Sequence, residues 1–94
     1  MPDDVGEIKK ELTPEQKLGL KELLPLLYDE KITAEELQNK IFEIGKSIEG
    51  LGYKKMFQAI YKVILNKKFG PRIGPFLIAL DREWVVNRIK QIIE

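Results

Sequence analysis

The chain has 94 residues, of which 44% are hydrophobic and 33% are charged, and it contains neither cysteine nor histidine. This length fits one domain with a small core, and the composition fits a globular helical protein rather than a disordered one. The missing residue types exclude disulfides, thiol catalysis, imidazole catalysis and the usual zinc sites. No run approaches the roughly 20 apolar residues of a membrane span, and the N-terminus lacks a signal-peptide pattern. We therefore expect a cytoplasmic protein without a membrane partner.

The formal net charge of +1 is unevenly distributed along the sequence. Residues 1–49 are acidic overall, and the charges of residues 81–94 balance. Residues 50–80 contain no carboxylate and six cationic side chains: Lys54, Lys55, Lys62, Lys67, Lys68 and Arg72. Such a local field attracts polyanions more strongly than the net charge suggests. The simpler interpretation, a solvated helix face whose compensating acids lie elsewhere, also stays open.

The N-terminal part of the chain divides into two regions. Residues 1–12 carry charges without a clear period, so we expect a flexible segment ahead of a helical domain that spans residues 13–94. Thr13-Pro14-Glu15-Gln16 is a helix-start pattern, because threonine caps, proline fits the first helical position and glutamine completes a capping box. The leucines that follow recur at helical spacing, and the main stripe consists of Leu20, Leu23, Leu24 and Leu27.

A second capping box runs from Thr33 to Glu36 and starts the next helix. Its apolar seam consists of Leu37, Ile41, Ile44, Ile48 and Leu51. Gly45 stands in the middle of this helix, where glycine costs about 1 kcal/mol relative to alanine. We therefore expect a neighbouring helix to approach the chain closely at Gly45.

The third periodic segment is the most clearly amphipathic one. Its apolar residues recur at intervals of three and four: Tyr53, Met56, Phe57, Ile60, Tyr61 and Ile64. Lys54, Lys55, Gln58 and Lys62 lie off this stripe, so the helix has a basic face. Aromatic residues at core spacing are more often core residues than base-stacking platforms, so we expect Phe57 and Tyr61 in the core.

Residues 65–77, Leu-Asn-Lys-Lys-Phe-Gly-Pro-Arg-Ile-Gly-Pro-Phe-Leu, are the most distinctive stretch. Its two Gly-Pro pairs do not fit a helix interior or a central strand, because glycine frees the backbone and proline lacks an amide donor. They predict a stiff turn that ends with Pro75 in the first turn of a new helix. Asp81 then caps a last helix. The sequence therefore predicts an all-α fold, a compact bundle of four or five helices with a Gly-Pro turn before the last two.

This turn and its flanks carry a resemblance to a known family. The matching motifs are Phe57-Gln58-Ala59-Ile60-Tyr61, the two Gly-Pro pairs around Arg72, and Leu80-Asp81-Arg82-Glu83-Trp84-Val85. Together they resemble the C-terminal end of archaeal and bacterial-type class I lysyl-tRNA synthetases over residues 12–93, and more weakly the end of glutamyl-tRNA synthetases. Asn66 stands where this resemblance leads us to expect glycine. The resemblance implies an anticodon-binding helical domain whose partners are lysine-accepting tRNA and the remainder of the synthetase.

The catalytic signatures of a class I synthetase, His-x-Gly-His and Lys-Met-Ser-Lys-Ser, are absent from the sequence, as are phosphate-binding glycine loops. We therefore expect no catalytic residue, no metal and no cofactor in this chain, with ATP bound by a catalytic core outside it. The first functional hypothesis is a non-catalytic tRNA-binding fragment of a lysine-tRNA ligase. The alternative is a helical protein-interaction module that pairs through its leucine-rich first helix.

The candidate RNA-binding residues are Lys54, Lys55, Lys62, Lys67, Lys68, Phe69 and Arg72. Lysines neutralise phosphates, an arginine in a fixed turn offers a bidentate fork to a phosphate or a guanine edge, and Phe69 offers a ring to an unpaired base. We expect Lys67, Lys68 and Arg72 to face one concave surface. Two alternatives stay open: Phe69 covers the turn as a minor core residue, or Arg72 straps the turn through helix-end carbonyls or Asp81.

Overall fold

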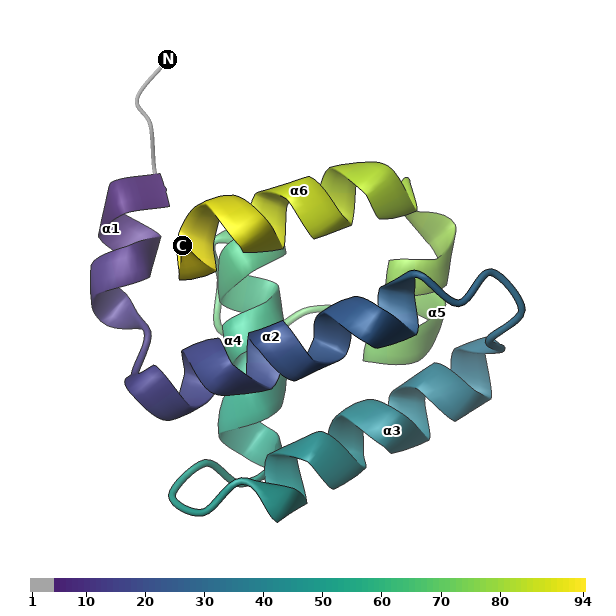
Figure 1. The fold of residues 1–94 in the computed structure, drawn as a ribbon, viewed down its shortest axis with the longest axis horizontal. Helices are drawn as coiled ribbons and strands as arrows, with labels where there is room; N and C mark the ends of the chain where they lie inside the picture. Colours follow the sequence, from purple (N-terminus) through teal and green to yellow (C-terminus); the bar gives the residue numbers. More distant parts are fainter. Residues whose placement is uncertain (1–4) are drawn as a thin grey trace.

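The computed structural model describes residues 5–94, and within them it contains six helices and no strand (Figure 1). The helices are α1 (Val5–Glu11), α2 (Pro14–Leu27), α3 (Ala34–Ser47), α4 (Tyr53–Leu65), α5 (Ile73–Ala79) and α6 (Arg82–Ile93). Figure 1 shows α2 between α6 and α3, with α4 crossing behind α2, and each of these neighbours is in contact with α2. The all-α prediction is confirmed. None of the helices in residues 5–94 is long and apolar enough to cross a membrane.

The structure differs from the sequence expectation in residues 5–12, which were expected to be flexible. Val5–Glu11 form α1, which raises the helix count above the expected four or five. Ile8 is completely buried and Leu12 is nearly so, and because they are four residues apart they lie on one side of the helix. That side packs against α6. The expectation for residues 1–4 lies outside the described residues.

Both predicted capping boxes are present. The backbone N–H of Gln16 donates to the hydroxyl oxygen of Thr13 at 3.1 Å, and the N–H of Thr13 donates to Oε1 of Gln16 at 3.0 Å. Thr33 and Glu36 form the same pair of bonds, at 3.1 and 3.2 Å. These bonds satisfy backbone donors that the first turn of a helix leaves without intrahelical partners.

The core receives side chains from all six helices. The largest completely buried side chains are Ile8, Leu20, Leu23, Leu37, Ile41, Met56, Ile60, Val63, Ile73, Leu77, Ile89 and Ile92. Helix α4 packs against α2, α3 and α6, and its residues Ala59 and Val63 are buried beside the expected stripe. This wide contact leaves α4 one exposed face, and that face carries the lysines.

Two glycines allow helices to approach each other closely. A Cβ atom on Gly45 would lie 2.7 Å from Cα of Tyr53, the first residue of α4, which confirms the expected close approach. A Cβ atom on Gly74 would overlap the carbonyl oxygen of Ala34, the first residue of α3. The N–H of Gly74 also donates to Oε1 of Gln38 at 2.7 Å. The start of α5 is therefore fixed against the start of α3.

Candidate nucleic-acid interface

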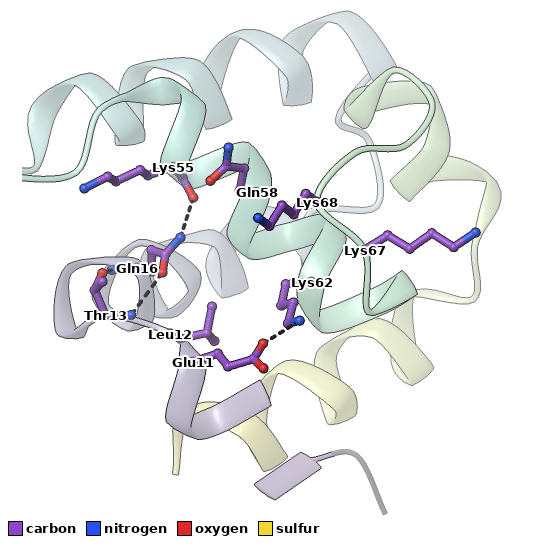
Figure 2. Close-up of a pocket in the computed structure, with 9 residues that line it drawn as sticks. All are labelled: Glu11, Leu12, Thr13, Gln16, Lys55, Gln58, Lys62, Lys67 and Lys68. Atoms are coloured by element: carbon purple, nitrogen blue, oxygen red, sulfur yellow. Dashed lines mark hydrogen bonds and ion pairs between the residues drawn. The ribbon is translucent and has the colours of Figure 1, made fainter. Parts of the chain in front are cut away.

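Two clefts lie along the exposed face of α4 and share the residues Gln58 and Lys68. The lysine cleft, of about 320 Å³, is lined by Glu11, Leu12, Thr13, Gln16, Lys55, Gln58, Lys62, Lys67 and Lys68 (Figure 2). The aromatic cleft, of about 480 Å³, is lined by Lys54, Phe57, Gln58, Tyr61, Lys68, Phe69 and Gly70. The predicted basic face of α4 is thus divided between two neighbouring hollows.

The lysine cleft gathers cations from α4 and from the turn that follows it. Figure 2 shows the ammonium groups of Lys62 and Lys68 pointing into the cleft, whereas Lys55 and Lys67 extend outward at opposite ends. Lys62 forms an ion pair with Glu11 from the end of α1. The lining therefore contains four lysines and a single carboxylate, so the cleft stays cationic although the charge of Lys62 is offset.

Gln16 connects the lysine cleft to its supporting helix. Its side-chain Nε2 donates to the backbone carbonyl of Lys55 at 3.0 Å, while its Oε1 completes the capping box with Thr13. Gln16 is only 8% exposed, and these two bonds give a hydrogen-bond partner to both polar ends of its buried amide. Sequence reasoning found the capping role and missed the bond to α4, because the partner is 39 residues away.

The Gly-Pro turn occupies residues 66–72, between α4 and α5. Asn66 ends α4 with a left-handed backbone (φ 55°), and its N–H donates to the carbonyl of Lys62 at 3.0 Å. Glycine is the commonest residue in this conformation after a helix, and asparagine also adopts it. Asn66 therefore supplies the geometry for which glycine was expected, and it directs Lys67 and Lys68 beyond the helix end. Pro75 lies in the first turn of α5, as predicted.

Tyr61 holds the Gly-Pro turn against α4. Its hydroxyl donates to the carbonyl of Pro71 at 2.5 Å. Gly70 is in close contact with the tyrosine ring, since a Cβ there would be 2.8 Å from a ring carbon. Tyr61 is 8% exposed, and burial raises the pKa of its hydroxyl above the ordinary value. The expected core position of Tyr61 is confirmed, and the hydroxyl adds a positioning role that its spacing did not reveal.

The structure does not bring Arg72 together with Lys67 and Lys68, so the expectation of one concave surface is wrong. Arg72 is exposed and lies in a separate depression with Ala34, Glu35 and Pro75. The physical reason is the close contact between the starts of α5 and α3, because Arg72 immediately precedes α5 and is carried to the α3 side. Its side chain forms no hydrogen bond or ion pair with the residues that the structure describes, so the strap is Tyr61.

The remaining candidate residues line the two clefts. Lys55, Lys62, Lys67 and Lys68 line the lysine cleft, whereas Lys54 and Phe69 line the aromatic cleft. Phe69 is 76% exposed, which excludes the interpretation of its ring as a minor core residue. Within residues 5–94, no cluster of three or more acidic side chains is arranged to hold a metal ion.

Residues 2–93 match the family model described as the anticodon binding domain. This match covers nearly the whole chain, so the chain belongs to the anticodon-binding domain family. It is 38% identical over 94 residues to a lysine–tRNA ligase of Archaeoglobus fulgidus, an alignment that covers 95% of this chain and 19% of the relative. It is 37% identical over 81 residues to a lysine–tRNA ligase of Thermococcus kodakarensis, covering 85% of this chain and 15% of the relative.

These comparisons confirm the resemblance to lysyl-tRNA synthetases that the Gly-Pro pairs carry. A lysine–tRNA ligase of Methanocaldococcus jannaschii is 34% identical over 86 residues, which is 92% of this chain and 16% of the relative. The chain therefore spans only a small part of the length of the relatives it matches. No solved structure matches the chain significantly.

Proposed function

We propose that this chain is the tRNA-binding domain of a lysine–tRNA ligase and that it contacts the anticodon arm through the exposed face of α4 and the Gly-Pro turn. The proposal is supported by membership of the anticodon-binding domain family and by similarity to lysine–tRNA ligases. The observation that carries it is the lysine cleft, in which a helix and a stiff turn place four lysines around one hollow. In this proposal the chain binds and positions tRNA, while ATP binding and aminoacylation belong to another part of the synthetase.

Phosphate neutralisation is the chemistry that the lysine cleft offers. Each lysine that pairs with a phosphate releases a condensed counterion, so affinity falls as salt rises. Lys68 points into the cleft and has no ion pair with the described residues, so its charge is fully available. Lys62 contributes less until RNA displaces Glu11 from it.

The experiment is a series of tRNA-binding isotherms at increasing salt concentration, using a lysine tRNA transcript. Lys68→Ala and Lys67→Ala should each weaken binding and reduce the slope of log affinity against log salt by about 0.7–0.9. Lys40→Ala is the matched control, because Lys40 is an exposed lysine on α3 in a depression that also contains Glu22 and Glu43. Unchanged affinity in both cleft variants, or an equal loss in the control, would contradict the proposal.

The alternative function is a module that pairs with other helices through its leucine-rich helix, and it would need the main leucine stripe of that helix to be exposed. Leu20, Leu23 and Leu27 of α2 are buried in the core of this chain. Leu18 is 49% exposed, but it lies apart from those three buried leucines. The leucine periodicity is therefore explained by the fold itself.

A further inference from the structure

The aromatic cleft differs from the lysine cleft in what it offers a ligand. Its walls come from the exposed face of α4 and from the Gly-Pro turn, and three of its seven lining residues are aromatic: Phe57, Tyr61 and Phe69. Tyr61 is buried, Phe57 is half-buried, and Phe69 is 76% exposed on the turn side. The cleft is therefore an apolar surface with one free ring at its edge.

The turn holds the backbone next to Phe69 in place. The Tyr61 hydroxyl donates to the carbonyl of Pro71, and Gly70 is in close contact with the Tyr61 ring, so these two contacts restrain the backbone next to Phe69. Proline adds stiffness by restricting φ. An aromatic side chain contributes to the stability of a fold through its burial, so a ring as exposed as Phe69 contributes little to folding stability. The free ring is thus available for a ligand.

The polar groups of the aromatic cleft define the complementary ligand. Lys54 and Lys68 contribute two cations, Gln58 contributes an amide with donors and an acceptor, and none of the lining residues is acidic. Neither lysine forms an ion pair with the described residues. A ligand that fits has a flat apolar ring, a polar edge and an adjoining negative charge. An unpaired nucleotide has all three features.

We infer that the aromatic cleft receives an unpaired nucleobase from an RNA loop, stacked on Phe69, with its phosphate on both Lys54 and Lys68 and its edge on Gln58. This inference rests on the proposed function and assigns a different part of the RNA to each cleft. Paired stem phosphates lie along the lysine cleft, and the unpaired base enters the aromatic cleft. Gln58 and Lys68, which line both clefts, then stand where the stem meets the loop. A paired base cannot enter, because it is stacked inside the duplex.

The aromatic surface continues from this cleft towards α3. The ring of Tyr53 meets Phe57 edge-on at 6.2 Å between centroids, and Phe42 of α3 lies 4.8 Å from Tyr53. Tyr53 and Phe42 are 39% and 36% exposed. Lys46 lies over the Phe42 ring, 5.3 Å from its centroid. Aromatic rings beside cationic side chains are the arrangement that proteins use to bind successive unpaired nucleotides, so this row is where a neighbouring base would stack.

The test compares two probes: an RNA hairpin with an unpaired loop, and the same RNA annealed to its complement so that every base is paired. Phe69→Ala should weaken hairpin binding roughly 5- to 150-fold without changing the salt slope, and it should leave duplex binding unchanged. Phe69→Leu keeps apolar area without a π face and should fall between wild type and Phe69→Ala. Trp84→Ala is the control, because Trp84 is another exposed aromatic residue, on α6 (47% exposed), that lines neither cleft.

A second variant tests the same cleft through charge instead of the ring. Lys54→Ala should reduce the hairpin salt slope by about 0.7 and leave the duplex slope unchanged, because Lys54 lines the aromatic cleft alone. Lys68→Ala should weaken both probes, since Lys68 lines both clefts. Circular dichroism confirms that each variant is folded.

The outcomes separate the inference from the function on which it rests. If Phe69→Ala and Lys54→Ala bind the hairpin like wild type while Lys68→Ala does not, the inference is overturned and the proposed function stands. If Phe69→Ala loses affinity equally for the hairpin and the duplex, the inference is also overturned. If the wild-type chain binds neither RNA, the proposed function fails together with the inference.

Discussion

The contact between α5 and α3 at Gly74 predicts that Gly74→Ala is destabilising. The added methyl group would overlap the carbonyl oxygen of Ala34 and would lie 3.0 Å from Cβ of Gln38. Both neighbours belong to the first turns of α3, where the backbone cannot move without disturbing the helix. The start of α5 must therefore shift away, and the bond from the N–H of Gly74 to Gln38 lengthens or breaks.

Three contributions set the expected change in the free energy of unfolding of Gly74→Ala. Overpacking of a fitted contact costs about 1–3 kcal/mol, and loss of the hydrogen bond adds about 1 kcal/mol. Alanine returns at most about 1 kcal/mol through its higher helix propensity. The net loss in the free energy of unfolding is therefore about 1–3 kcal/mol. For a domain of this size each kcal/mol corresponds to about 4–8 °C in melting temperature, so we expect a fall of roughly 4–24 °C.

Thermal and urea unfolding of Gly74→Ala and Gly6→Ala measure this effect against a matched control. Gly6 is an exposed glycine in α1, and a Cβ there would have no neighbour within 4 Å. The control should therefore be unchanged or slightly more stable than wild type. Wild-type stability in Gly74→Ala, or equal losses in both variants, would refute the close contact between α5 and α3.

Three further predictions concern the turn and the lysine cleft. Tyr61→Phe should lower the free energy of unfolding by about 1 kcal/mol, because it removes the bond to Pro71. Burial raises the Tyr61 pKa above its value in the unfolded chain, so the stabilisation by the protonated hydroxyl is complete at neutral pH and is lost as rising pH ionises the tyrosine. In urea unfolding, the free energy of unfolding should therefore fall less at alkaline pH in Tyr61→Phe than in wild type. Glu11→Gln should increase tRNA affinity and steepen its salt dependence by freeing Lys62, with little change in stability because the pair is at the surface; unchanged binding isotherms would contradict this. Arg72→Ala should change the free energy of unfolding by less than about 0.5 kcal/mol, because the side chain has no bond to the described residues; a larger loss in urea unfolding would restore the strap interpretation.

Local features were predictable from the sequence because their physics lies within a few residues. The capping boxes at Thr13 and Thr33 need only partners three residues away. Pro75 was placed correctly because proline fits the first turn of a helix and little else in that stretch. The close approach at Gly45 followed from the cost of glycine inside a helix, which only tight packing offsets.

Features that depend on distant residues were not predictable. Helix α1 exists because Ile8 and Leu12 meet a surface that includes α6, at the other end of the chain. Arg72 lies apart from Lys67 and Lys68 because α5 packs against α3 at Gly74, and the sequence of the turn alone does not reveal this contact. The ion pair of Lys62 with Glu11 forms because α1 packs against the rest of the fold and brings a carboxylate to a face of α4 whose own charged residues are all basic.

The central claim is that RNA binds the exposed face of α4 and the Gly-Pro turn, and a nuclear magnetic resonance titration with an anticodon-arm hairpin tests it most directly. The account predicts that the amide signals that shift belong to α4 and turn residues that line the two clefts: Lys54, Lys55, Phe57, Gln58, Lys62 and residues 67–70. Signals around Lys40 and Glu43, in the depression between α2 and α3, should stay in place. Shifts centred on that depression, or no shifts at all, would contradict the account.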